Sequence, residues 1–364
     1  MKKISIYVSN QELKPSNYYR IVQYAKRISG VTIYNIYPTF IFRLMIRYRS
    51  TRIRRRIFEK ILRIVSNYRI KKYLKKDLNS LPDIVVVQKS MSKFSSTNQI
   101  RKLREKLISN TKFLWDFDDI IFQSKQIQDD EYYLYCKYAK NIIVTSNYLK
   151  NDLPSECHNK IKILPTTDFD MHISFSKLKD FNRNRLEKMK SEIDLIWLAT
   201  SSNLDYLVSV LPYLEKTAKI LKIRYHKQLT LKIVCDKGLD TGCYYLNVRF
   251  IKWSREVAIE EVRSASIGIM PLIPSFFSKG KGGFKLIQYI SSGLPVIASN
   301  VGYNEFVFKD DIGFLLDQYD DWIDAIIELS INRKKWENCS TKALQVWEKY
   351  FNAEDNLKFW EKML

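Results

Sequence analysis

Short runs of apolar, often β-branched residues alternate along the chain with longer stretches whose apolar positions recur every three or four residues. The runs predict buried strands, and the longer stretches predict helices. In the first half, strands are expected at residues 4–8, 31–36, 84–87, 113–115, 142–144 and 161–164, and helices at 18–28, 55–80, 97–108 and 130–139. In the second half, strands are expected at residues 195–199, 230–234, 248–251, 267–270 and 296–298, and helices at 204–223, 255–265 and 284–292. Two successive alternations of this kind predict an α/β protein with two parallel, doubly wound sheets.

The same pattern divides the chain into two domains, a connection and a tail. At 364 residues the chain is long enough to form two hydrophobic cores. We expect an N-terminal Rossmann-like domain over residues 1–175, a polar and weakly periodic connection over 176–192, and a C-terminal Rossmann-like domain over 193–345. Residues 346–364 are expected to form a helical, aromatic-rich tail.

Positive charge is concentrated in one predicted helical region of the first domain. The formal net charge is +22, and residues 43–76 contain 14 Lys or Arg against the single acid Glu59. Apolar residues are interleaved with these charges, as in basic amphipathic helices that lie on anionic membrane surfaces. The phosphates of a nucleic acid attract the same side chains, and a solvated helix face is the third interpretation. We favour the membrane. The candidate membrane contacts are Arg52, Arg54, Arg55 and Arg56.

Cysteine and histidine residues give no sign of a disulfide framework or a metal site. The five cysteines are scattered, odd in number and without a CxxC pair, and the three histidines lack metal-ligand spacing. No apolar run is long enough to span a membrane, and the N-terminus lacks the apolar core of a signal peptide. We therefore expect a protein of the reducing cytosol.

A glycine-rich stretch in the second domain is the strongest candidate for a ligand site. Gly280, Gly282 and Gly283 allow a sharp turn and a close approach of the backbone to a ligand. The next predicted helix begins directly after them, with Lys281 and Lys285 beside its N-terminus. A helix N-terminus of this kind favours an anion such as phosphate. An ordinary loop–helix–strand unit with solvated lysines explains the same residues equally well.

Polar residues also follow predicted strands at three other places. A Thr-Ser-Ser run after the strand at 195–199 can hold a phosphate or sugar, or can simply cap the next helix. Three aspartates after the strand at 113–115 can bind ligand hydroxyls or brace a loop, and a metal site is the least favoured interpretation. An arginine after the first strand either reaches a ligand or is an ordinary surface residue. These residues are Thr200, Ser201 and Ser202; Asp116, Asp118 and Asp119; and Arg20.

The order of the motifs adds a family resemblance. The run FKLIQYISSGLPVIASNVGYNEFV from Phe284, followed by DIGFLL from Asp311, resembles the C-terminal nucleotide-sugar-binding half of GT-B glycosyltransferases, in particular the retaining family 4 group. Upstream, PSNYYR, LWDFDD, IVTSNYL, IWLATSS, FIKW and IGIMPL are similar to further motifs of that group and follow its order. The resemblance covers nearly the whole chain. It implies a GT-B fold, with two Rossmann-like domains facing a cleft and a C-terminal helix that crosses back to the N-terminal domain.

The resemblance also implies roles for individual residues. Lys285 takes the lysine position of the motif, where an ammonium group can neutralise the leaving diphosphate. Two glutamates of the family pattern fall on Gly280 and Gln288; the amide of Gln288 can still bond a ribose hydroxyl, whereas Gly280 offers only its backbone. The catalytic candidates are Lys285, Lys281 and Glu305. The donor-side candidates are Thr200, Ser201, Ser202, Gly280, Gly282, Gly283, Phe284, Gln288 and Gly302, and the acceptor-side candidates are Arg20, Asp116, Asp118 and Asp119.

We therefore expect a glycosyltransferase that moves a hexose from a nucleotide-diphosphate sugar, UDP- or GDP-linked, to a lipid-linked glycan acceptor. The basic region would hold it on the inner face of the plasma membrane, as a peripheral cytoplasmic enzyme of surface polysaccharide biosynthesis. The resemblance implies a retaining reaction without a metal or other cofactor, and no nucleic-acid partner. Two alternatives stay open: a GT-B-fold UDP-sugar epimerase, and a nucleic-acid-binding protein that uses the basic stretch.

Overall fold

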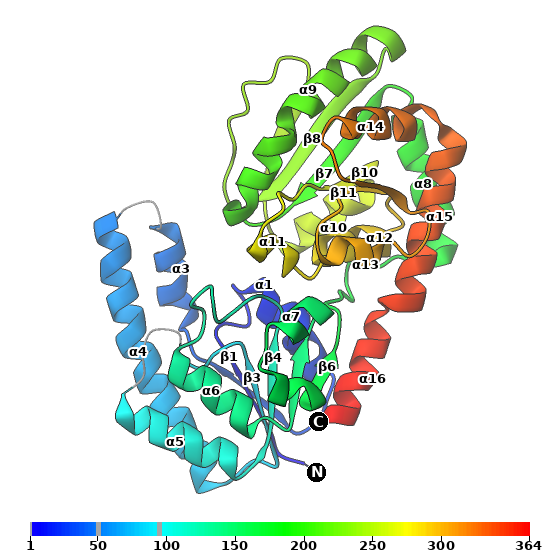
Figure 1. Cartoon of the computed structure of the whole chain (residues 1–364). Coiled ribbons are helices and arrows are strands. Elements are labelled where there is room, and N and C mark those ends of the chain that lie inside the picture. The colour runs from blue at the N-terminus through cyan, green and yellow to red at the C-terminus, as the bar shows by residue number, and fades with distance from the viewer. Residues whose placement is uncertain (1, 49–51, 93–96) are drawn as a thin grey trace. The chain divides into compact units, whose positions relative to one another are not determined.

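The computed structural model describes residues 2–48, 52–92 and 97–364, and the side chain of Arg52 lies outside this description. The chain forms two compact units. Unit 1 comprises Met1–Thr166 and Glu354–Leu364, and unit 2 comprises Thr167–Ala353. Each unit is built on one six-stranded sheet with helices packed on it (Figure 1).

The sheet of unit 1 has the order β2-β1-β3-β4-β5-β6, and every neighbouring pair of strands is parallel. All five residues of β1 and all five of β3 are buried, as expected for central strands that are covered on both faces. The strands are β1 (Ile4–Val8), β2 (Val31–Asn35), β3 (Ile84–Gln88), β4 (Lys112–Phe117), β5 (Asn141–Val144) and β6 (Ile161–Ile163).

In unit 1, the predicted helix ranges cover neither α3 (Thr39–Arg47) nor α7 (Asn147–Asn151), and the region after the first strand differs from the predicted helix 18–28. There the chain forms α1 (Pro15–Asn17), a π-helical turn (Tyr18–Val22) and α2 (Gln23–Ala25) in place of one regular helix. Short π-helical insertions are frequent at functional sites. The remaining elements are α4 (Arg52–Asn79), α5 (Asn98–Ser109), α6 (Asp129–Tyr138), a 3-10 turn (Ser155–Lys160) and, at the end of the chain, α16 (Ala353–Met363).

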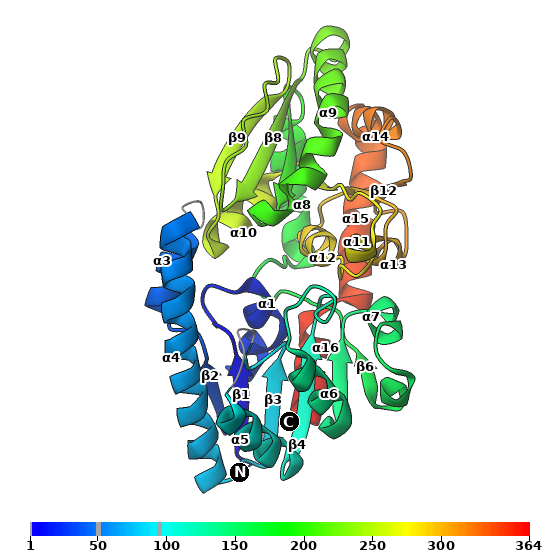
Figure 2. The same cartoon turned by 60° about the vertical axis from the view of Figure 1, so that its left-hand side comes forward.

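Helix α4 is attached to unit 1 through its C-terminal part. The buried carboxylate of Asp77 accepts hydrogen bonds from the hydroxyls of Tyr7 and Tyr34, both at 2.8 Å. Residues 53–57, by contrast, are all exposed. Both views show α3 and α4 side by side (Figures 1 and 2). No helix in the described part of the chain combines the length and the apolar character needed to cross a membrane. The buried apolar residues of α4 are Leu62, Ile70 and Leu74.

The sheet of unit 2 has the order β12-β11-β10-β7-β8-β9 and is also parallel throughout. Successive side chains of a strand point to opposite faces, and in β7 Leu195 and Trp197 join one apolar cluster while Ile196 and Leu198 join another. The sheet thus separates two hydrophobic layers. Its strands are β7 (Glu192–Leu198), β8 (Gln228–Cys235), β9 (Asn247–Lys252), β10 (Ile267–Met270), β11 (Val296–Ser299) and β12 (Gly313–Leu316).

Four helices of unit 2 lie outside the helix ranges predicted from the sequence. Two are short, at Phe276–Lys279 and Tyr303–Val307, and two are longer, at Phe175–Lys188 and Asp321–Ile331. The helices are α8 (Phe175–Lys188), α9 (Leu204–Tyr225), α10 (Arg255–Ser264), α11 (Phe276–Lys279), α12 (Phe284–Ser291), α13 (Tyr303–Val307), α14 (Asp321–Ile331) and α15 (Arg333–Tyr350), with a 3-10 turn at Ser201–Asn203.

The structure confirms the α/β class with two parallel sheets, and the units divide at different residues from those expected. Unit 2 begins at Thr167, and α8 occupies most of the segment 176–192 that was expected to be a connection. Its helical pattern is weak because one of its buried positions is Arg185, whose guanidinium donates to the main-chain oxygens of Ser292 and Gly293.

The C-terminal helix crosses back to unit 1, as predicted. Helix α15 runs through residue 346 as part of unit 2, and the chain rejoins unit 1 at Glu354. The Asn356 side chain then donates to the main-chain oxygen of Pro165 at 2.8 Å and to the Tyr24 hydroxyl at 3.2 Å. These hydrogen bonds hold α16 against α2 and against the segment that follows β6.

Candidate active site

In each sheet, the strand order reverses at one point. In unit 2, β7 lies between β10 and β8, and in unit 1, β1 lies between β2 and β3. The loops after the strands at such a point run in opposite directions, and ligands of open parallel sheets bind there, at the carboxyl ends of the strands. Most of the predicted site residues follow these strands or their neighbours.

The turn after β7 is held by a carboxylate that follows β8. Asp236 accepts from the main-chain N–H of Ser201 at 2.6 Å and from its hydroxyl at 2.9 Å. Burial acts to raise the pKa of Asp236, but these hydrogen bonds hold it below its ordinary value. The hydroxyls of Thr200 and Ser202 bond each other at 2.9 Å. The predicted Thr-Ser-Ser run therefore forms an ordered polar turn at the carboxyl end of β7.

Lys281 connects the glycine-rich loop to this turn. Its amino group donates to the side-chain oxygen of Asn203 at 2.7 Å and lies 5.4 Å from the ring centre of Tyr206. Asn203 in turn donates to the hydroxyl of Thr200 at 3.0 Å. Two segments that are 78 residues apart in sequence thus share one hydrogen-bonded cluster.

Gly283 begins α12 in a conformation that favours glycine. Its φ is +60°, and a Cβ atom there would approach Tyr303 to 3.0 Å and Val307 to 3.1 Å. Gly280 lies in the same loop with an ordinary φ of −80°. The loop therefore places the first N–H groups of α12, from Phe284 onwards, at the carboxyl-end edge of the sheet. Gly282 belongs to the same turn.

Lys285 lies in the first turn of α12, and its neighbour is a neutral amide. Its Nζ is 3.4 Å from Oε1 of Gln288, which is buried one turn further along. Burial lowers the pKa of Lys285 to about 8; the charge of Lys281 acts in the same direction and Asp168 opposes it. An ammonium group that is poorly compensated in this way gains from an incoming anion.

The turn before α13 packs directly against the glycine-rich loop. Gly302 has a φ of +60°, and a Cβ atom at this position would come within 2.5 Å of the main-chain oxygen of Lys279. The two segments can approach so closely only without a side chain. Glu305 lies exposed in the first turn of α13.

In unit 1, Arg20 and Asp116 form a fully buried ion pair. The Nε of Arg20 is 3.2 Å from each carboxylate oxygen of Asp116, and Nη1 donates to the main-chain oxygen of Leu164 at 2.6 Å. Neither side chain is exposed. Arg20 was expected either to reach a ligand or to lie on the surface; instead, it bridges the π-helical turn, β4 and the end of β6.

Asp118 and Asp119 are held by a lysine that the sequence did not single out. Lys89, directly after β3, pairs with Asp118 at 2.8 Å and also with Asp119. Its φ is +62°, an uncommon value for a residue with a side chain. Although burial acts against the charge, the two aspartates raise the pKa of Lys89 above its ordinary value. Ser16 also donates to Asp118, at 3.0 Å.

Comparisons with known proteins bear on both units. Residues 198–332 match the family model of the glycosyl transferases group 1. The whole chain is similar to HepE of Anabaena in complex with UDP, with 11% identity, a TM-score of 0.64 and 99% of that chain covered. It is similar over its whole length to a glycosyltransferase from Rickettsia africae, with 15% identity, a TM-score of 0.64 and 97% of that chain covered. It is also similar over its whole length to the sucrose-phosphate synthase of Thermosynechococcus elongatus, with 12% identity, a TM-score of 0.63 and 98% of that chain covered. No curated protein matches the sequence.

The chain is a glycosyltransferase of the GT-B fold. At 15% identity or less, the three structural likenesses establish its fold. The group 1 match covers the unit 2 residues from Thr200 to Glu305, and so includes the donor-side candidates.

The sequence analysis of this glycosyltransferase missed several polar residues at the carboxyl-end edges of the two sheets. Lys89 and Asp236 lie two residues after the predicted strands 84–87 and 230–234, so the rule that polar residues after parallel strands gather at one edge would have found them. Asp168 lies near the end of the range predicted for the N-terminal domain, residues 1–175, and no local pattern identifies it.

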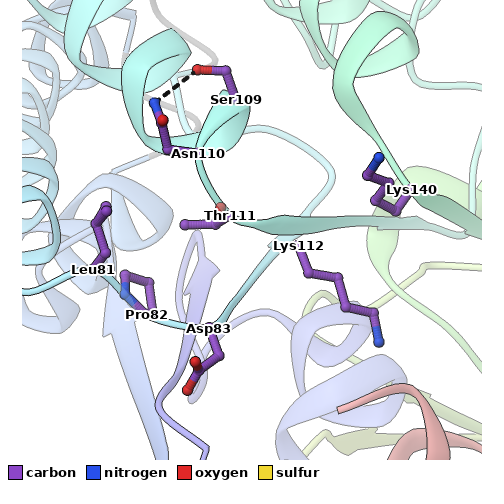
Figure 3. Close-up of a pocket in the computed structure, with 8 residues that line it drawn as sticks. All are labelled: Leu81, Pro82, Asp83, Ser109, Asn110, Thr111, Lys112 and Lys140. Carbon is purple, nitrogen blue, oxygen red and sulfur yellow. Dashed lines mark hydrogen bonds between the residues drawn. The ribbon is translucent and has the colours of Figure 1, made fainter.

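A hollow in unit 1 lies at the opposite end of the unit 1 sheet from Lys89 and Asp116. It borders the amino-terminal ends of β3 and β4 (Figure 3). On one side Asn110 and Ser109 are hydrogen bonded to each other, and the amino group of Lys112 donates to the main-chain oxygen of Met363 at 2.6 Å. Because ligands of open parallel sheets bind at the carboxyl ends, we do not assign the transfer reaction to this hollow.

Among the residues that the structure describes, no group of three or more His, Cys, Asp or Glu side chains is arranged to hold a metal ion. Asp116 is paired with Arg20, and Asp118 and Asp119 with Lys89. A reaction that needs no metal or other cofactor stays a prediction.

Proposed function

We propose that this glycosyltransferase moves a hexose from a nucleotide-diphosphate sugar, held on unit 2, to a hydroxyl of a lipid-linked glycan. The observation that carries the donor assignment is the meeting of the α12 N-terminus, Lys281, Lys285 and the turn at Thr200 inside the group 1 match. Helix N-termini and lysines together are a common site for phosphate groups. UDP is the first nucleotide to test, because the HepE structure of the same fold contains UDP.

In the proposed reaction, the bond between the anomeric carbon and the diphosphate oxygen breaks and a bond to the acceptor oxygen forms. The nucleoside diphosphate leaves with the bonding electron pair, and its departing oxygen takes the proton that the acceptor hydroxyl loses. Negative charge therefore grows on the diphosphate, where Lys285 and the first N–H groups of α12 are suited to stabilise it. Retention of the anomeric configuration is expected from the family resemblance.

Isothermal titration of the protein with UDP, GDP, dTDP and CMP, without added metal, tests the donor assignment. Replacing Lys285 by Ala should weaken binding of the preferred nucleotide about tenfold to a hundredfold, because a hydrogen bond to a charged group is lost. Lys279→Ala removes an exposed lysine from the same loop and should leave the affinity unchanged. Equal affinity of wild type and Lys285→Ala would refute the assignment.

The membrane proposal rests on a stripe of exposed apolar residues along α4. Their spacing of four, four, three and four residues keeps them on one face of the helix. Ile53 is 74% exposed and Ile64 61% exposed. On the neighbouring helix α3, Phe40 is 73% exposed. The stripe consists of Ile53, Ile57, Ile61, Ile64 and Tyr68.

Cations flank this stripe along the helix. Arg54 and Lys72 lie on one side of it by helical position, and Lys60 and Arg63 on the other. An anionic lipid surface matches both components, since cations meet the headgroups while isoleucines enter the boundary with the acyl chains. A nucleic acid would use only the cations. The observed pattern therefore favours the membrane.

Co-sedimentation with vesicles tests this surface. Vesicles of phosphatidylcholine with phosphatidylglycerol should bind the wild-type protein. The double variant Ile57→Ser, Ile64→Ser should bind about tenfold or more weakly, from the lost burial of two apolar side chains. Ile223→Ser, Ile331→Ser is the matched control on unit 2, where the two isoleucines are 58% and 41% exposed.

Charge is tested separately from the apolar stripe. Neutralising Arg54, Arg55 and Arg56 to Gln should weaken vesicle binding by about 1 kcal/mol per residue at low salt and by less at high salt. Unchanged vesicle binding by the isoleucine variant would refute the membrane proposal. Oligonucleotide binding that depends on the arginines alone would favour the nucleic-acid alternative.

The proposed setting follows from these two sites. A donor that is a soluble nucleotide sugar and an acceptor anchored in lipid meet at a membrane surface that faces the cytoplasm. We propose that the enzyme is peripheral on the inner face of the plasma membrane and acts in the assembly of a surface polysaccharide.

A further inference from the structure

The geometry around α12 points to a residue that supports the donor site without belonging to it. We propose that Asp168 is a positioning residue: it orients the Gln288 amide and supplies the negative charge behind Lys285. The inference rests on the proposed role of Lys285 at the donor diphosphate. It concerns a side chain at the beginning of unit 2, far from α12 in the sequence.

Asp168 is buried and fixed through both carboxylate oxygens. Its Oδ2 accepts from the Nε2 of Gln288 at 2.7 Å. Its Oδ1 accepts from the main-chain N–H groups of Asp170 at 2.9 Å and of Met171 at 3.4 Å. The side chain is only 1% exposed. A carboxylate held in this way has one orientation, and it presents that orientation to Gln288.

The segment that carries Asp168 is itself attached to α12. The main-chain N–H of Ile173 donates to the oxygen of Ser291 at 3.0 Å, and the Ser292 hydroxyl donates to the oxygen of Met171 at 2.8 Å. Asp168 therefore keeps its position relative to the helix, as a positioning role requires.

The carboxylate determines which end of the Gln288 amide faces Lys285. A carboxylate accepts hydrogen bonds and donates none, so it selects the NH₂ group of the amide. The carbonyl oxygen of Gln288 is then left facing the Nζ of Lys285, at 3.4 Å. A glutamate at position 288 would bring a second carboxylate against Asp168, and the two could not both ionise. Glutamine thus suits the position beside Asp168.

Asp168 also balances the charges around Lys285. Burial and Lys281 both act to lower the pKa of Lys285, whereas Asp168 and, more weakly, the Cys235 thiol act to raise it. Asp168 also interacts electrostatically with the guanidinium of Arg263, which donates to the main-chain oxygen of Asp170 at 2.7 Å. Without the Asp168 charge, Lys285 would lose its proton at a lower pH and bind a diphosphate less well.

UDP titrations at pH 6.5, 7.5 and 8.5 test the inference. Asp168→Asn keeps the size and one hydrogen-bond acceptor but removes the charge. Its UDP affinity should be nearly unchanged at pH 6.5 and fall almost tenfold at pH 8.5, since a pKa lower by one unit removes the proton from Lys285 only near and above the midpoint. Asp170→Asn removes a neighbouring carboxylate that does not bond Gln288 and should show no comparable pH dependence. Thermal unfolding checks that each variant is folded.

A second measurement does not depend on any ligand. Reductive ¹³C-methylation makes lysine amino groups visible by NMR, and the Lys285 signal is the one missing from Lys285→Ala. Its titration midpoint should move down by about one pH unit in Asp168→Asn and stay in place in Asp170→Asn. A purely structural role for Asp168 would not move it.

The outcomes separate this inference from the proposed function. If Lys285→Ala binds UDP as tightly as the wild type, the donor assignment fails, whatever the NMR titration shows. If Lys285→Ala binds weakly but Asp168→Asn behaves like the wild type at all three pH values and in the NMR titration, the inference about Asp168 is wrong. An unchanged Lys285 midpoint in Asp168→Asn overturns it in either case.

Discussion

The two carboxyl-end edges of this glycosyltransferase occupy equivalent places in their sheets but treat charge in opposite ways. In unit 1, Arg20 is paired with Asp116, and Lys89 with Asp118. In unit 2, the bonded neighbour of Lys285 is the amide of Gln288, which in turn donates to the carboxylate of Asp168. At the unit 1 edge, the cations are paired with carboxylates of the protein. At the unit 2 edge, the ammonium group of Lys285 has little compensation from nearby negative charge.

This difference indicates which charged residues stabilise the fold and which are available to bind a ligand. A buried cation that already has its anion has little to gain from a ligand, and losing either partner leaves an unpaired buried charge. A cation held by a neutral amide gains a partner when a diphosphate arrives, so its interaction energy becomes available to binding. We therefore expect substitutions at the unit 1 edge to act on stability, and substitutions at the unit 2 edge to act on affinity.

The largest expected effect comes from breaking the buried pair of unit 1. Arg20→Ala should lower the free energy of unfolding by about 3–5 kcal/mol, because Asp116 is left charged and buried. Asp116→Ala should cost a similar amount for the converse reason. Urea denaturation, followed by far-UV circular dichroism, measures both.

The control for this prediction lies on the same edge. Asp119 is 43% exposed, so Asp119→Asn should cost less than about 1 kcal/mol. A loss under about 1 kcal/mol for Arg20→Ala, together with a loss of acceptor-dependent activity, would show that the pair is functional and would remove the contrast between the two edges.

The sequence pattern predicted the sheets well because their central strands are buried on both faces. Strands such as β3 contain an uninterrupted apolar run, Ile84–Val87, which its short length and β-branched composition identify as a buried strand. The pattern failed at α8, where Arg185 takes a buried position and is satisfied by carbonyl oxygens. Side-chain charge in a sequence says nothing about partners that are supplied by the backbone more than 100 residues away.

The candidate site was predictable where local geometry determines function and not where long-range pairing does. Gly283 and the turn at Thr200 could be selected because their residue types match a glycine turn and a helix start. The pairing of Arg20 with Asp116, 96 residues apart in sequence, depends on the parallel register of the sheet. The contact of Asp168 with Gln288 spans 120 residues and left no local signal.

A second prediction sharpens the comparison by testing what holds the unit 2 edge together. Gly302→Ala should destabilise the protein by about 2–4 kcal/mol and weaken nucleotide binding, because the new methyl group meets the main-chain oxygen of Lys279. Gly242 shares the φ of +60° but has nothing within 4 Å of the corresponding position. Gly242→Ala should therefore cost only the conformational penalty, about 1–2 kcal/mol. Equal losses in the two variants would mean that the close approach of the loops is unimportant.

The smallest expected effect is a pH dependence of stability that arises from Lys285 itself. Its pKa in the folded protein is about 8, against an ordinary value of 10.5, chiefly because of burial. Between these two values the unfolded chain binds more protons than the folded protein, so the contribution of Lys285 to stability rises with pH. Below about pH 8 the wild-type protein bears the full cost of burying the Lys285 charge, so Lys285→Met should be more stable than the wild type. The gain should be only about 1 kcal/mol, because the Lys285 side chain is partly exposed. Urea denaturation at pH 7, 8.5 and 10 should show this advantage shrinking as the pH rises. An advantage that stays constant, or a methionine variant that is less stable at pH 7, would mean that Lys285 is compensated like Lys89, and the two edges would then differ only in sequence.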